Sequence, residues 1–503
     1  MAPFYFYLLL ALSSLLIFFV HKFLRSEKLL SEHSNPPGPR GLPFIGNLHQ
    51  LDISNLPNQL WQLSKIYGPV MYLKLGYLPA IVISSPRLAK AVLRTHDLSF
   101  CSRPSLFGFK KMSYNCSDVV LSPYGDYWRE MRKIVTLHLF SSSRVHSFRS
   151  IREEEVFQMI KRISEEGSLG EVTNLTGRIM PLTSTIVCRV AFGKKFDEGY
   201  MRKFEGMLHE CQAVLANFYF SDNFPLLGWL DTLIGSTARL DKIFKDMDVF
   251  YQELIDEHIS PSRPSSMEGD VIDILLQLKN GTQSSSIDIT LDNIKAILMN
   301  IFVAGTETTA GTTIWTMASL IKNPRAMKKV QEEVRKLMNG KDKIDEEDLE
   351  NTELPYLEAV IKESLRLYPI VPLLIPRESI VDCELEGYKI KAKTIVYVNA
   401  LAIGRDPQVW ENAEEFYPER FLDSEIDFKG QDFEFIPFGA GRRICAGMYM
   451  GTTTLKLILS NLLYSFDWEL PAGMVKEDVD TQVLPGISMH MKNPLRLVAK
   501  KYN

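Results

Sequence analysis

One cysteine lies in a glycine-rich loop near the C-terminal end of the chain, directly ahead of a long apolar segment. The loop reads PFGAGRRICAG over residues 437–447. Backbone N–H groups, a helix N-terminus and a metal all stabilise a cysteine thiolate, and this loop can supply all three. Gly439 permits a positive φ and a close approach of the backbone to a flat cofactor. We therefore expect Cys445 to be an iron ligand, with Phe438 covering the sulfur and Arg443 directed at a carboxylated ligand.

A lone cysteine has a simpler explanation, because unpaired cysteine is among the residue types most often buried. A glycine-rich loop followed by a buried cysteine would account for this residue taken alone. The whole pattern Phe-x-x-Gly-x-Arg-x-Cys-x-Gly is present, however. It resembles the haem-binding signature of cytochromes P450, in which a cysteine thiolate is the proximal ligand of haem b, iron protoporphyrin IX. The resemblance implies that Cys445 is the metal ligand and that Phe438, Gly439 and Arg443 bind the cofactor.

The length of the chain, 503 residues, would by itself allow two to four domains. Cytochromes P450 place such a length in one catalytic domain, so the resemblance implies a mainly α fold with small β-sheets (α+β) over residues 46–503. Residues 67–76 and 80–84 have the composition of two short strands joined by a Gly/Pro turn. Most of the remaining chain is helical in period.

Composition excludes some classes of partner. The net charge is −4 and the sequence has no polybasic block, so we expect no nucleic acid partner. The six cysteines are scattered without a CxxC pair, which is typical of a reducing compartment.

The N-terminus carries a 17-residue apolar run over residues 4–20. Basic residues follow the run, starting at Lys22, whereas a secretory signal peptide carries its charge ahead of the run. The sequence therefore predicts a transmembrane signal anchor over residues 1–22, with the chain from Lys22 onward in the cytosol. A signal peptide and a buried helix are the alternatives. Residues 23–45 are basic and then proline-rich, which predicts a stiff hinge before the catalytic domain.

A second chemical centre lies in the apolar run over residues 290–322, which predicts a long central helix of about 50 Å. Its middle, AGTETTAGTT over residues 304–313, contradicts a plain buried helix. A threonine-rich kink with hydroxyls bonded back to preceding carbonyls would explain it in structural terms. The stretch also resembles the acid-threonine motif of cytochromes P450. That resemblance assigns Thr308 to stabilising partly reduced oxygen and Glu307 to proton delivery.

Two further motifs point to haem carboxylates. Trp128 and Arg132 are four residues apart and share one face of a predicted helix, which alone describes an amphipathic surface helix. Beside Cys445, the pair resembles the family's contacts with the haem propionates. Arg377, in Pro-Arg-Glu, resembles another propionate ligand.

Glu363 and Arg366 are three residues apart on a predicted helix, and such a pair alone is usually a solvated surface pair. It resembles the Glu-x-x-Arg pair of cytochromes P450. That pair is completed by the arginine of a Pro-x-Arg-Phe element, here Arg420. The resemblance implies a structural role.

Position relative to these motifs predicts the substrate pocket. Its lining is expected from the 104–122 region and from Phe302, Ala304, Ile370, Val371, Leu373, Leu374 and Ile487. These side chains are mainly aliphatic or small, which favours a mid-sized, largely apolar substrate.

The combined motifs, including PPGP at 36–39 and GRDP at 404–407, resemble the plant microsomal A-type group of specialised metabolism. This implies a haem-thiolate monooxygenase that uses O2 and NADPH-derived electrons. It would hydroxylate or oxidatively rearrange a terpenoid, alkaloid or phenolic. The implied partners are NADPH-cytochrome P450 reductase, cytochrome b5 as a second candidate, and membrane lipid. The implied location is the endoplasmic reticulum membrane, single-pass, with the catalytic domain facing the cytosol.

Other functions stay open from sequence alone. YWREMRK at 127–133 and REEE at 152–155 resemble segments of aldoxime-oxidising members. A haem isomerase or dehydratase of the same fold would need no external electrons, and the Glu307-Thr308 pair argues against it. A noncatalytic haem-binding protein or membrane scaffold would need no oxygen-activating residues.

Overall fold

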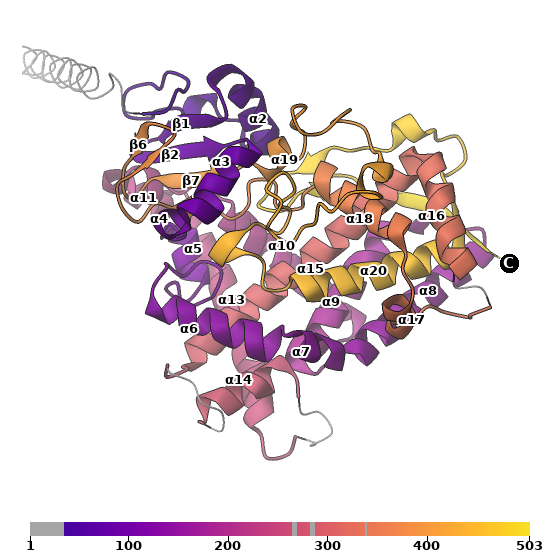
Figure 1. The fold of residues 1–503 in the computed structure, drawn as a ribbon. Coiled ribbons are helices and arrows are strands. Elements are labelled where there is room, and N and C mark those ends of the chain that lie inside the picture. The colour runs from indigo at the N-terminus through magenta and orange to yellow at the C-terminus, as the bar shows by residue number, and fades with distance from the viewer. Residues whose placement is uncertain (1–34, 264–268, 282–286, 338–339, 503) are drawn as a thin grey trace, which may run out of the picture.

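The computed structural model describes residues 35–263, 269–281, 287–337 and 340–502 (Figure 1). The predicted anchor over residues 1–22 and the hinge up to residue 34 lie outside the described residues. Across the described ranges, no helix combines the length and the apolar character needed to cross a bilayer.

Nineteen α-helices are defined in the described residues. Their bounds are α2 Leu56–Tyr67, α3 Pro86–Lys90, α4 Asp97–Phe100, α5 Phe107–Met112, α6 Asp126–Ile134, α7 Ser142–Ser147, α8 Arg149–Ser168, α9 Leu175–Phe192, α10 Glu198–Leu215, α11 Phe220–Asn223, α12 Trp229–Leu233, α13 Ser236–Ile259, α14 Val271–Lys279, α15 Leu291–Lys322, α16 Pro324–Leu337, α17 Glu346–Asn351, α18 Pro355–Leu367, α19 Ala400–Ile403 and α20 Met448–Ser465.

The strands are short and form four small sheets. Their bounds are β1 Val70–Leu75, β2 Leu78–Ile83, β3 Thr173–Asn174, β4 Arg377–Glu378, β5 Cys383–Leu385, β6 Tyr388–Ile390, β7 Ile395–Val398, β8 Phe466–Glu469, β9 Val483–Leu484, β10 His490–Met491 and β11 Arg496–Lys501. In the largest sheet, ordered β1-β2-β7-β4, β1 and β2 pair antiparallel while β7 runs parallel to β2. The two strands predicted from residues 67–84 are confirmed.

Helix α15 runs through the middle of the molecule, with α9 on one side and α18 and α20 on another (Figure 1). It begins at a capping box in which Thr290 and Asn293 bond each other's backbone N–H groups. The predicted long central helix is confirmed, and it is unbroken over all 32 residues.

The unusual middle of α15 is stabilised by both hydroxyls and close packing. Thr312 donates to the Thr308 carbonyl at 2.8 Å, and other threonines of the helix repeat this back-bonding. Gly305 faces α9, where a Cβ would lie only 3.0 Å from Val187 Cγ2. The helix-propensity cost of this glycine, about 1 kcal/mol, is offset by close packing of α9 on α15.

Candidate active site

The loop that carries Cys445 is built by its own backbone. The Cys445 N–H donates to the Phe438 carbonyl at 3.0 Å, which closes the turn directly before α20. Gly441 has φ +68°, and a Cβ there would lie 2.1 Å from the Leu93 carbonyl oxygen. Only glycine fits this conformation and this approach.

Cys445 is open on one side and enclosed on the others. The residue is exposed, yet surrounding protein atoms desolvate its thiol enough to raise its pKa. The Gly447 N–H and the charge of Arg132 act in the opposite direction. A metal seated over the sulfur would complete the stabilisation of the thiolate, because coordination favours the deprotonated form.

Positively charged side chains gather behind this loop. Arg377 is buried and donates to Asp97 at 2.7 Å and to the Ala440 carbonyl at 2.8 Å. Burial, together with the nearby charge of Arg377, lowers the pKa of Arg443 to about 9. Burial and the charges of these two arginines also lower the pKa of Arg103 well below its ordinary value.

The acids around these three arginines do not balance them. Asp97 serves both Arg377 and Arg442, and burial raises the pKa of Asp118 to about 6. Buried cations that depress one another's pKa favour an added anion. The two propionate carboxylates of a haem meet this requirement, and an exposed sulfur beside them meets the requirement for an iron ligand.

The structure places both members of the predicted Trp-Arg pair at this site, on helix α6. Arg132 donates to the Ile444 carbonyl at 2.6 Å, immediately before Cys445. Trp128 donates to the Val119 carbonyl at 2.9 Å, and its ring lies 4.1 Å from the Arg443 guanidinium. Arg103 was not predicted from the sequence, because its neighbours Arg377 and Arg443 are distant along the chain.

Helix α15 carries the second half of the site. Ala304 is exposed although it lies in the middle of a largely buried helix, and Thr308 is half-buried one turn later. The Thr308 hydroxyl donates to the Ala304 carbonyl at 2.8 Å. Glu307 is buried, and its Oε2 lies 3.2 Å from Nε2 of His490. No sequence spacing pointed to His490, which follows Glu307 by 183 residues.

The two halves of the site are adjacent. Helix α20, which begins three residues after Cys445, packs along α15. A Cβ at Gly451 of α20 would lie 3.7 Å from the Thr309 hydroxyl. The Cys445 loop and the threonines of α15 therefore belong to one region of the molecule.

The predicted Glu-x-x-Arg pair is buried and bidentate. Arg366 donates to both carboxylate oxygens of Glu363 at 2.7 Å, and neither side chain is exposed. Arg420 adds a third contact to Glu363 at 3.1 Å. This burial excludes the solvated surface pair.

The predicted pocket residues divide into two groups. Ala304 is exposed, and Val371, Leu373, Leu374 and Ile487 are half-buried. Leu374 lies close to the cysteine loop, since a Cβ added at Gly439 would be 3.8 Å from its Cδ1. Ile370 is buried, with its Cδ1 near Gly311. Phe302 is fully buried with its ring 4.0 Å from that of Phe204, so it packs in the aromatic core.

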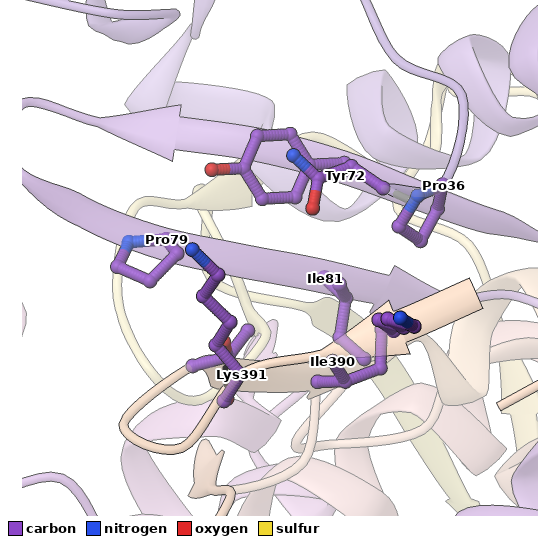
Figure 2. A pocket seen from close by; sticks show the side chains of 9 residues that line it. Pro36, Tyr72, Pro79, Ile81, Ile390 and Lys391 are labelled. Atoms are coloured by element: carbon purple, nitrogen blue, oxygen red, sulfur yellow. Dashed lines mark hydrogen bonds between the residues drawn. The ribbon is translucent and has the colours of Figure 1, made fainter. Parts of the chain in front are cut away.

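Two clefts lie elsewhere on the surface. Figure 2 shows one of about 90 Å³, lined by Pro36, Tyr72, Pro79 and residues of the β5–β6 hairpin. The other, of about 330 Å³, lies among α8, α9 and α10. Neither includes a residue predicted for the active site.

Comparison with known proteins decides the family. The sequence model of cytochrome P450 matches residues 36–497. The chain belongs to the cytochrome P450 family. Its cofactor is haem b, and the predicted P450 fold is confirmed. A solved zebra fish cytochrome P450 with progesterone has a TM-score of 0.74 and 25% sequence identity, covering 88% of this chain and 99% of that one.

Relatives of this P450 are plant enzymes. It is 48% identical to 5-OH-xanthotoxin synthase and to 6,7,8-trihydroxycoumarin synthase of Pastinaca sativa, over 100% of this chain and 99% of each relative. Strychnine-11-hydroxylase of Strychnos nux-vomica is 44% identical over 96% of both chains. The prediction of a plant specialised-metabolism monooxygenase is confirmed at this level. A redox partner reductase and a small-molecule substrate follow from the family.

Proposed function

We propose that this P450 hydroxylates a coumarin-type phenolic, with Cys445, the arginine cluster and the Glu307-Thr308 pair as its working parts. The observation that carries the proposal is the arrangement of α15 and α20. Exposed Ala304 and the Thr308 hydroxyl lie on the helix that packs beside the Cys445 loop. Names of the relatives that match over the whole chain supply the substrate class.

Cofactor binding is divided among several elements. Cys445 would hold the haem iron through its thiolate, while Phe438 and Gly439 shape the turn around it. Arg132, Arg377, Arg443 and Trp128 would bind the two propionates, releasing the carbonyl and carboxylate partners that they contact in this structure. When bound, haem supplies the iron at which dioxygen is reduced and cleaved.

Proton delivery is assigned to α15. The buried carboxyl of Glu307 would pass protons toward the reacting oxygen. The Thr308 hydroxyl would stabilise the partly reduced oxygen by hydrogen bonding. The apolar surroundings of α15 keep bulk water away from this step. The substrate would lie over Ala304, against Leu373, Leu374 and Val371.

The reductase is proposed to dock on the face beside the cysteine loop. Arg129 and Lys133 of α6 and Arg442 of the loop are exposed on it. An acidic surface of NADPH-cytochrome P450 reductase would complement these charges. Cytochrome b5 is a second candidate for the same face.

The proposed location is the endoplasmic reticulum membrane, with the catalytic domain in the cytosol. An apolar surface supports it. Exposed residues are Leu42, Phe44, Ile45 and Tyr77 near the hinge, and Leu226, Trp229, Leu233 and Ile234 around α12. Hydrogen bonds from Gly76 to Ile45 and from Tyr77 to Asn223 join these segments. Contiguous exposed apolar surface of this kind is typical of a membrane contact.

Oxygen labelling in microsomes tests the activity and the substrate class together. The full chain, a plant reductase and NADPH would receive a panel of coumarins, monoterpenoids, indole alkaloids and aldoximes under heavy-isotope O2. We expect 6,7-dihydroxycoumarin or a related coumarin to gain one labelled oxygen atom. Labelled product only from another compound class would replace the coumarin assignment, and products without label would contradict the monooxygenase mechanism.

Thr308→Ala tests the role of α15. We expect the haem spectrum to be kept while product formed per NADPH falls about tenfold or more, because general acid-base assistance is worth about 10²–10⁴ in rate. The lost electrons should be recovered as hydrogen peroxide. Undiminished coupling of NADPH to product would contradict the proton-delivery role.

A further inference from the structure

A histidine outside the haem-binding motifs contacts the proposed proton-delivery acid. We propose that His490 is a positioning residue for Glu307, holding its carboxylate in place on α15 by a hydrogen bond from Nε2. This inference rests on the proton-delivery role proposed for Glu307. The Nε2 to Oε2 distance is 3.2 Å, and the two side chains are 20% and 2% exposed.

Glu307 depends on this contact. A buried carboxylate needs hydrogen-bond donors, because burial without them is costly. In the described part of the chain, His490 is the side chain hydrogen-bonded to the Glu307 carboxylate. Cys211 lies close enough for the charge of Glu307 to add to burial in raising the pKa of its thiol to about 12, but among the described residues its thiol makes no hydrogen bond to this carboxylate. The proposed hydrogen bond requires the imidazole to carry a proton on Nε2, since only a ring N–H donates.

The backbone holds His490 at this place. Just before it, the Met489 N–H donates to the Ile370 carbonyl at 2.7 Å. The Met489 carbonyl accepts from the Trp315 indole of α15 at 2.9 Å. The residue directly before strand β10, which carries His490, is therefore bonded to the same helix that carries Glu307.

Gly311 makes room for the imidazole. It lies four residues after Glu307, on the same face of α15. A Cβ at Gly311 would lie 3.4 Å from both Cε1 and Nδ1 of His490, and 3.1 Å from Ile370 Cδ1. A side chain there would press on Ile370 and already touch the ring with its first carbon, so this glycine in the helix interior has a packing reason.

Loss of the hydrogen bond between His490 and Glu307 should affect the coupling of NADPH oxidation to product formation, and not the binding of substrate. Once protonated, a carboxyl group held in one orientation delivers its proton to one place, whereas a rotating carboxyl group delivers it less efficiently. Loss of the His490 contact should lower the product formed per NADPH and raise peroxide release. Substrate affinity should stay the same, because Glu307 is buried beside the pocket lining rather than in it.

Two substitutions at one position separate the hydrogen bond from the bulk of the ring. His490→Leu removes the donor, whereas His490→Gln places an amide N–H near the position of Nε2. In full-length protein with reductase, NADPH and 6,7-dihydroxycoumarin, we expect His490→Leu to lower product per NADPH about tenfold. His490→Gln should restore it to within about threefold of the unmodified protein.

Two spectra and a control variant show whether the folding, the haem site and the substrate site are kept. The carbon monoxide spectrum and the spectral titration with 6,7-dihydroxycoumarin should be unchanged in both variants. His146→Leu is the matched control, because that ring pairs with Glu350 at an exposed position. If His490→Leu does not fold, His490→Asn replaces it, since the shorter amide cannot reach Glu307.

A double-substitution cycle decides whether His490 acts through Glu307. If it does, His490→Leu combined with Glu307→Gln should be no worse than Glu307→Gln alone. Additive losses, normal coupling in His490→Leu, or failure of His490→Gln to restore coupling would each overturn the inference. Normal coupling in Glu307→Gln alone would instead overturn the proposed proton delivery, and this inference with it.

Discussion

One buried carboxylate in this P450, Glu363, is held by two arginines and a backbone N–H. Glu363 has its carboxylate oxygens bonded to Arg366, Arg420 and the Tyr417 N–H. A fully buried carboxylate of this kind leaves two guanidinium groups unpaired when it is removed. The charge network thus fixes the segment before the cysteine loop against α18.

Glu363→Gln should lower the free energy of unfolding by about 3–5 kcal/mol, the range for breaking a buried ion pair. Glu358→Gln on the same helix is the control, because its contact with Lys456 is half-exposed and should be worth less than about 1 kcal/mol. Denaturant unfolding followed by circular dichroism measures both. Equal effects of the two substitutions would contradict a structural role for the buried network.

Sequence reasoning reached the residues whose partners lie within a few positions. Spacing placed Glu363 and Arg366 together and put Trp128 and Arg132 on one helix face. It did not find Arg103 or His490, because their contacts join segments hundreds of residues apart and depend on tertiary packing. It also misplaced Phe302, whose position beside Ala304 in sequence does not show that helix rotation turns its ring into the core.

Helix α15 shows how one element can be both a structural axis and a part of the site. Its length and its central position were predicted from the apolar run, whereas the capping box at its start was not predicted. Its threonines also have the structural role considered from the sequence, since their hydroxyls bond back to carbonyls of their own helix. The proposed chemical role of the Thr308 hydroxyl would therefore be added to a structural role that the hydroxyl already has.

One of these threonines also joins two helices. Thr316 bonds its hydroxyl to the Thr312 carbonyl and to the Ser364 hydroxyl of α18 at 2.9 Å, all buried. Thr316→Val should cost about 1–3 kcal/mol because it leaves Ser364 without this partner. Thr313→Val, which removes only a bond to its own helix, should cost less than about 1 kcal/mol. A thermal or denaturant unfolding series that ranks them in reverse order would contradict this packing account.

At the scale of the whole molecule, exposed apolar residues lie around the β1–β2 turn and around α12, and backbone hydrogen bonds join the turn to Ile45 and to Asn223. The N-terminal hinge enters beside β1, where Pro37 accepts a hydrogen bond from Tyr72. Hydropathy of the sequence showed that apolar residues are present around Trp229. It could not show that they lie next to the hinge, because the joining contacts at Gly76 and Tyr77 are tertiary.

Trp229 offers a direct probe of this apolar surface, since it is 60% exposed. In nanodiscs that contain brominated lipid, we expect quenching of tryptophan fluorescence in the full chain. Trp229→Phe should remove most of the quenching, while Trp61→Phe should leave it. Quenching that is unaffected by Trp229→Phe would show that a different surface contacts the membrane.

The central claim is that the Cys445 thiolate holds the haem iron. Arg132 and Arg377 donate to carbonyls of the loop that carries this cysteine, and α20, which follows the loop, packs along α15. The most direct measurement is the carbon monoxide difference spectrum of reduced full-length protein, compared between the unmodified chain and Cys445→Ser. We expect the thiolate-type spectrum in the former and its loss in the latter, with the helical content retained by circular dichroism. A thiolate-type spectrum that persists in Cys445→Ser would contradict the account.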